Sequence, residues 1–212
     1  MHEAFSVNDF NLAAGKTNFT PHQEMYRDVV DVTLDAEALE RIADSPEYEI
    51  ALAVPPKGLP LTLSAVIYGV FYKLDEAVRS TPHLRLPATA GLRDYRVDAR
   101  QAARQGQLID LICAAATIPP VFDVPTWEGE RVLDGGMLDK APLPSKDEGS
   151  TLVLLTSRYS NCPGTQRRAY VQPSTEVAAD KIDFADASKV TLTWEQGERD
   201  GKAWLARQDA AG

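Results

Sequence analysis

The sequence predicts an α/β layered domain. Apolar residues recur at every second position in some stretches and at helical spacing in others, and the two kinds of stretch alternate along the chain. A composition of 44% hydrophobic and 25% charged residues is ordinary for a globular protein, and 212 residues suit one domain with a sizeable core. Neither a repeat nor a linker divides the chain, so we expect a single domain over residues 1–212.

Capping signals mark the first two expected helices. Thr20 is a typical N-cap, with Pro21 at the first helical position and Gln23 completing a capping box. A second short helix is expected after Asp35, and it stops at Pro46.

Two later helices are expected from the same kind of signal. Asp98 and Gln101 form another capping box, and the helix that they begin continues through Leu108 and Leu111 until Pro119 breaks it. The chain closes with a helix after Asp186, weakened by the glycines at 197 and 201.

Several stretches read as strands. In residues 47–54 the side chains of Tyr48, Ile50, Leu52 and Val54 alternate onto one side. Further short strands are expected in three places: one that ends near Val97, one at residues 130–136, and one at residues 167–174. The second of these runs into D-G-G, and W-E-G-E-R ahead of the D-G-G reads as a hairpin. The continuous apolar run at 150–157 is typical of a strand buried on both faces of a parallel sheet.

Charge and composition exclude several classes of function. A net charge of −9 and a pI near 4.8 argue against a nucleic-acid partner, which requires a basic face. Two cysteines (Cys113, Cys162) and three scattered histidines (His2, His22, His83) fit neither a disulfide framework nor a metal site. The first residues lack the pattern of a signal peptide, so cytoplasmic residence is the expectation.

Residues 58–72 test the possibility of a membrane span. The segment carries no charge between Lys57 and Lys73, yet it is shorter than the roughly 20 residues that a helix needs to cross a bilayer. We therefore expect a buried helix.

The chain contains no complete nucleophile motif. G-x-S-x-G, in which a tight turn exposes a serine hydroxyl, does not occur. Ser64 lies in a helical apolar stripe with no glycine two residues away, which favours a structural role. Glycine-rich phosphate loops and H-E-x-x-H are absent too. Asp134 and Asp139, which flank G-G-M-L, are the remaining candidates, and taken alone each favours a turn cap.

The context of Asp134 carries a resemblance. Residues 111–144, LICAAATIPPVFDVPTWEGERVLDGGMLDKAPLP, join a small-residue helix end, I-P-P-x-F, a hairpin and a strand into D-G-G. This order resembles the C-terminal catalytic segment of the patatin-like phospholipase family. The Gln172-Pro173 pair and a late G-x-x-D-G, with Gly197, Asp200 and Gly201, are similar to bacterial members.

The resemblance implies a site and a substrate. Asp134 matches the aspartate of the family's Ser–Asp dyad, and Gly135 and Gly136 match the glycines that let the backbone turn. The implied fold is a three-layer α/β hydrolase sheet, and the implied substrate is a lipid or another acyl ester, with no metal or organic cofactor. Peripheral membrane contact fits such a substrate, although no basic amphipathic helix argues for it.

Two departures from the family pattern qualify this expectation. Lys140 stands where many members have Asn, a minor change. The family's glycine-rich oxyanion loop and G-x-S-x-G segment match nothing here, so we expect an incomplete sheet that lacks its N-terminal strands. The chain alone is then expected to be inactive, and to be poorly stable or to self-associate through an uncovered sheet edge.

Three readings of function follow from the sequence. The first is the C-terminal portion of a Ser–Asp lipid acyl hydrolase with Asp134 as general base. The second is a non-catalytic remnant or interaction domain that keeps the scaffold without the nucleophile. The third is an unrelated α/β binding domain in which Asp134 only stabilises a turn.

Overall fold

A computed structural model describes residues 22–58, 70, 74, 81–83, 86–118, 123–146, 149–179 and 186–210. Contacts between Cα atoms divide the chain into two compact units. The large unit comprises residues 21–147, and the small unit comprises residues 1–20 and 148–212. The expectation of one domain stays a prediction.

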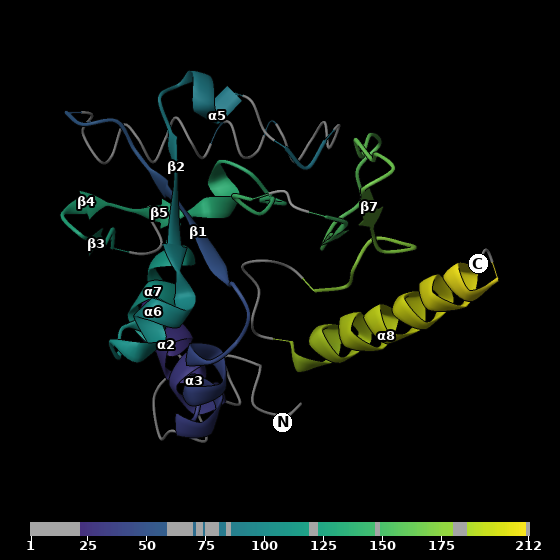
Figure 1. Ribbon diagram of the computed structural model, residues 1–212, viewed down its shortest axis with the longest axis horizontal. Coiled ribbons are helices and arrows are strands. Elements are labelled where there is room, and N and C mark those ends of the chain that lie inside the picture. Colours follow the sequence, from purple (N-terminus) through teal and green to yellow (C-terminus); the bar gives the residue numbers. More distant parts are fainter. Residues whose placement is uncertain are drawn as a thin grey trace. The chain divides into compact units, whose positions relative to one another are not determined.

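The large unit mixes helices with short antiparallel strands (Figure 1). Its main sheet has the strand order β2-β1-β5, and a separate hairpin pairs β3 with β4. The elements are α2 (His22–Thr33), α3 (Ala36–Ala43), β1 (Glu49–Val54), α5 (Leu86–Thr89), β2 (Arg93–Asp98), α6 (Ala99–Arg104), α7 (Leu108–Ala115), β3 (Thr126–Trp127), β4 (Glu130–Arg131), β5 (Leu133–Asp134) and the 3-10 helix η2 (Gly135–Met137). The mixed α/β class predicted from the sequence is confirmed.

β1 is the centre of the main sheet, and its two faces are buried by different partners. Leu52 and Val54 belong to a buried cluster with residues of α6 and α7, and Ile50 packs against that cluster. Ala53, on the opposite face, packs with Leu133, Met137 and Leu92. This is the alternation predicted for residues 47–54, except that Tyr48 precedes the strand and is exposed.

Two of the predicted helix caps are present. Asp35 accepts a hydrogen bond from the Ala38 N–H at 2.8 Å, and α3 ends before Pro46 as expected. Asp98 accepts from the backbone N–H groups of Arg100 and Gln101 at the start of α6.

The single helix expected after Asp98 is two helices. α6 ends at Arg104, and Gly106 adopts a positive φ of 69° before α7 begins. The Gly106 N–H donates to the Ala103 carbonyl and the Gln107 N–H donates to the Ala102 carbonyl. This is a Schellman termination, which a glycine readily adopts, and it is the reason that one expected helix becomes two.

The expected buried helix at 58–72 falls mostly outside the described residues, as do Ser64 and the cap at Thr20–Pro21. Val70, which is described, is helical and 51% exposed. Within the described ranges, no helix combines the length and the apolar character that a membrane span requires.

The small unit contains β6 (Thr151–Leu154), β7 (Arg168–Val171) and α8 (Ala187–Asp209). β6 and β7 pair in parallel, as the apolar run predicted. Burial on both faces is wrong, because Leu152 is 47% and Leu154 71% exposed, and the described part of this sheet has two strands only. The expected last helix is confirmed, and it runs unbroken through its two glycines.

Candidate active site

The register of the main sheet decides which way Asp134 faces. β5 runs antiparallel to β1, with Leu52 opposite Asp134 and Ala53 opposite Leu133. Directly opposite residues of an antiparallel pair project to the same face. The Asp134 side chain therefore lies on the face where Leu52 packs against the helices, and Leu133 lies on the other.

Both the backbone and the carboxylate of Asp134 are tied to neighbouring groups. Its N–H donates to the Thr117 carbonyl at 2.9 Å, and one carboxylate oxygen accepts the Gly136 N–H at 2.7 Å. Thr117 is itself buried, and its hydroxyl donates to the Cys113 carbonyl at 3.2 Å. The end of α7 and the D-G-G turn are thus linked through one buried residue.

The two glycines of the motif have different reasons to be glycine. A Cβ on Gly135 would lie 2.4 Å from the Ala51 carbonyl oxygen, a distance that no real side chain tolerates. A Cβ on Gly136 would lie 3.1 Å from the Asp134 Oδ1 that it now bonds. Gly135 therefore lets the turn lie directly against β1, and Gly136 keeps the space beside the carboxylate open.

Tyr26 on α2 lies within the electrostatic reach of Asp134. Burial raises the pKa of the Tyr26 phenol, and negative charge on Cys113 and on Asp134 raises this pKa further. The Tyr26 phenol is therefore near enough to Asp134 to respond to its charge, although the two residues are remote in sequence.

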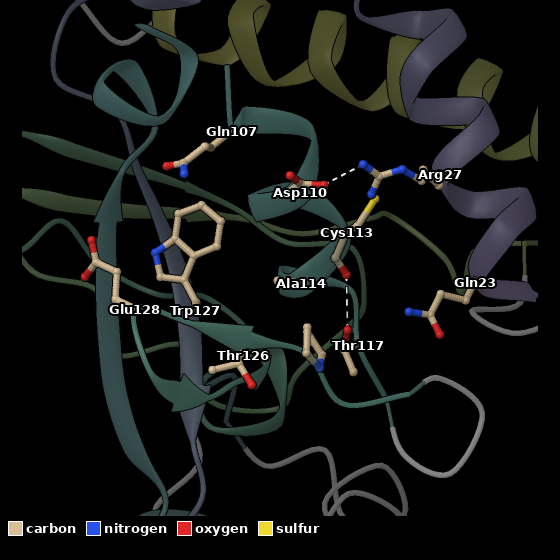
Figure 2. A pocket seen from close by; sticks show the side chains of 11 residues that line it. Gln23, Arg27, Gln107, Asp110, Cys113, Ala114, Thr117, Thr126, Trp127 and Glu128 are labelled. Carbon is tan, nitrogen blue, oxygen red and sulfur yellow. Dashed lines mark hydrogen bonds and ion pairs between the residues drawn. The ribbon is translucent and has the colours of Figure 1, made fainter. Parts of the chain in front are cut away.

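A cavity of about 390 Å³ opens beside Thr117 in the large unit (Figure 2). Its walls come from α2, from α7 with the turn that follows it, and from the β3–β4 hairpin. An ion pair between Arg27 and Asp110 borders it, with 2.5 Å between nitrogen and oxygen, and Trp127 and Cys113 also line it. The carbonyl of Thr117, one of the lining residues, accepts the backbone N–H of Asp134.

The cysteines are poor nucleophiles. Burial raises the pKa of the Cys113 thiol, and although Arg27 lowers it, the net shift is upward. Burial also raises the pKa of the Cys162 thiol. A thiol must ionise to attack an acyl group, so neither cysteine is suited to replace a serine.

Asp139 is a turn cap with a histidine partner. Its carboxylate accepts the Ala141 N–H at 2.9 Å, as expected from the sequence, and it also pairs with His83. From the sequence His83 is one of three scattered histidines, and nothing there predicts its pairing with Asp139. Among the described residues, no three His, Cys, Asp or Glu side chains gather as a metal site requires.

Comparison with known proteins supports the resemblance seen in the sequence. The family model for patatin-like phospholipases matches residues 5–145, which is most of the chain and includes Asp134 and both glycines of the turn. No curated protein and no solved structure matches the chain. The chain belongs to the patatin-like phospholipase family.

Proposed function

We propose that this chain carries the aspartate half of a Ser–Asp lipid acyl hydrolase, with Asp134 as the general base. The observation that supports this most directly is the hydrogen-bonded turn at the end of β5. The Thr117 carbonyl accepts the Asp134 backbone N–H, the Asp134 carboxylate accepts the Gly136 N–H, and Gly135 packs against β1 where no side chain would fit. Such positioning is what proton transfer to a fixed acceptor requires.

The proposed reaction has two steps. The hydroxyl of a G-x-S-x-G serine gives its proton to Asp134 and attacks the acyl carbonyl, and the proton then passes to the leaving alcohol. Water attacks the acyl-enzyme, gives a proton to Asp134, and the serine regains it as the free acid leaves. A carboxylate can accept the proton of a hydroxyl where water is excluded, because the hydrogen bond between the two groups strengthens there. No metal or organic cofactor is needed.

The nucleophile is not among these 212 residues. No G-x-S-x-G occurs in them, and the raised thiol pKa values disfavour both cysteines as substitutes. In our proposal the serine and the oxyanion donors belong to a longer protein, of which this chain is the C-terminal portion. The 212 residues alone are then inactive toward a lipid or other acyl ester.

A second candidate is a non-catalytic scaffold or interaction domain of the same family. The absence of G-x-S-x-G favours it. In the first proposal the longer native protein contains the serine. In the second, the native protein lacks the serine, just as these 212 residues lack G-x-S-x-G.

The first experiment is the intact mass and N-terminal sequence of the protein isolated from the cells that make it. A longer product with a G-x-S-x-G ahead of Met1 favours the hydrolase. A native product that begins at Met1 and hydrolyses no acyl ester overturns it and favours the scaffold.

Asp134→Asn tests the base in a product that carries the serine. We expect loss of p-nitrophenyl ester hydrolysis by a factor of about 10²–10⁴, the usual contribution of a general base, with the turn kept because an amide oxygen still accepts the Gly136 N–H. Asp35→Asn is the matched control, because Asp35 caps α3 by the same kind of hydrogen bond. Full activity of Asp134→Asn would overturn the assignment.

A further inference from the structure

The loop that follows the D-G-G turn is held at its far end by residues 81–83. The His83 Nδ1 lies 2.9 Å and 3.0 Å from the two carboxylate oxygens of Asp139. The Lys140 N–H donates to the carbonyl of Pro82 at 3.0 Å, and Pro82 is fully buried. A segment remote in sequence is therefore joined to the loop by a side-chain pair and by a backbone hydrogen bond.

Asp139 connects this anchor to the turn itself. The Gly135 carbonyl accepts the N–H groups of Leu138 and Asp139 at 2.9 Å and 3.0 Å. The Asp139 carboxylate also accepts the Ala141 N–H. The loop is thus fastened at one end by β5, which carries the Asp134 carboxylate, and at the other end by Asp139.

The Asp139 carboxylate requires a hydrogen-bond donor from His83. An ionised carboxylate only accepts hydrogen bonds, so the His83 Nδ1 carries the hydrogen. The two side chains are 23% and 28% exposed, for His83 and Asp139 respectively, so most of the pair is shielded from water that would compete for these bonds. A side chain without an N–H at this position leaves the carboxylate short of a donor.

We propose that His83 is a positioning residue for Asp134. It fixes Asp139, which closes the loop, and the closed loop holds the turn in which Gly136 orients the Asp134 carboxylate. The inference rests on the proposed function of Asp134, but the structural clamp can be tested without any catalysis.

Amide hydrogen exchange on the full 212-residue chain tests the clamp. We expect His83→Ala to speed the exchange of the Lys140, Ala141 and Gly136 amides by about tenfold, because local opening of the loop becomes easier. His83→Asn, whose side-chain amide places a donor where Nδ1 lies, is expected to restore slow exchange. Exchange of the Ala99 amide, which bonds the Tyr48 carbonyl just before β1, is expected to remain unchanged.

Arg100→Gln is the matched control. This substitution removes the ion pair between Arg100 and Asp98, which lies in the same unit but away from the loop. We expect hydrogen exchange of the Lys140, Ala141 and Gly136 amides to stay as slow as in the wild type. Three results would overturn the proposal: loop exchange in His83→Ala as slow as in the wild type, no rescue by His83→Asn, or a uniform rise that includes Ala99.

Activity separates this proposal from the proposed function. In a form that carries the serine and hydrolyses p-nitrophenyl butyrate, we expect His83→Ala to lower kcat about tenfold with KM unchanged, and His83→Asn to recover it. If His83→Ala keeps the wild-type kcat while Asp134→Asn is inactive, the positioning role of His83 is overturned and the proposed function of Asp134 stands. If no form hydrolyses an ester, the proposed function fails, and the exchange experiment still decides the clamp.

Discussion

The contact between Gly135 and the backbone of Ala51 leaves no room for a methyl group. Relief requires that either the turn or β1 move, and β1 is buried on both faces. We expect Gly135→Ala to destabilise the protein by about 1–3 kcal/mol, the usual cost of overpacking. Urea denaturation followed by circular dichroism measures the change.

A glycine without neighbours provides the opposite control. Gly201 lies in α8, and nothing lies within 4 Å of a Cβ built on it. Gly201→Ala is expected to stabilise that helix by about 0.5–1 kcal/mol, because alanine loses less backbone entropy. Equal effects of the two substitutions would contradict the steric argument for Gly135.

Tyr26 reports on the charge of Asp134. Because that charge contributes to the raised pKa of the phenol, Asp134→Asn is expected to lower the Tyr26 pKa. Burial, the larger cause, is unchanged, so the pKa stays above its ordinary value. NMR titration of the Tyr26 ring, assigned with Tyr26→Phe, measures the shift. An unchanged pKa in Asp134→Asn would mean that the carboxylate faces elsewhere.

Some parts of the site could be predicted from sequence, and others could not. D-G-G and its turn are local, so Asp134 and its glycines follow from adjacent residues. His83 and Asp139 are 56 positions apart, and nothing in the periodicity of either segment links them. Tyr26 likewise reaches the site only because α2 packs against α7.

Among the elements, α6 shows how a cap depends on pH. The hydrogen bond and charge of Arg100, together with the two N-cap hydrogen bonds, hold the pKa of Asp98 well below its usual range. A carboxyl whose pKa is lower in the folded state contributes stability above its unfolded pKa, near 3.9, and loses it as the pH falls toward the folded value.

Asp98→Ala tests this cap. We expect a lower Tm than in the wild type at pH 7, and a difference that shrinks as the pH falls below about 4, since the wild-type carboxyl is then being protonated. Calorimetry across this range measures it. A Tm difference that does not depend on pH would show that the charge of Asp98 contributes nothing.

The break between α6 and α7 shows where helical spacing misleads. Apolar residues continue at helical intervals on both sides of Gly106, so periodicity predicts one helix. The glycine adopts a left-handed conformation, and the chain changes direction. We expect Gly106→Ala to destabilise the fold by about 1–2 kcal/mol, because that conformation is unfavourable for a residue with a Cβ. Urea denaturation measures the loss, and an unchanged midpoint would contradict the role of the left-handed turn.

For the whole molecule, the described strand order leaves β5 at one end of the main sheet. At that end the Asp134 N–H bonds the carbonyl of Thr117, which is not part of a strand, and the exposed Leu152 and Leu154 of β6 present apolar surface that promotes association. We expect the purified chain to self-associate, or to unfold over a broad range of temperature. Light scattering and calorimetry measure this, and a sharp transition of a strict monomer would contradict it.

The register between β1 and β5 also has a consequence for insertions and deletions. One residue added to or removed from residues 132–134 would shift the pairing by one position, and Asp134 would then project among Leu92 and Met137 on the opposite face. The hairpin tip at Glu128–Gly129, where both residues have positive φ, lies outside the paired positions and can change length without that inversion. Length variation among relatives is therefore expected at the hairpin tip and not between the hairpin and the aspartate.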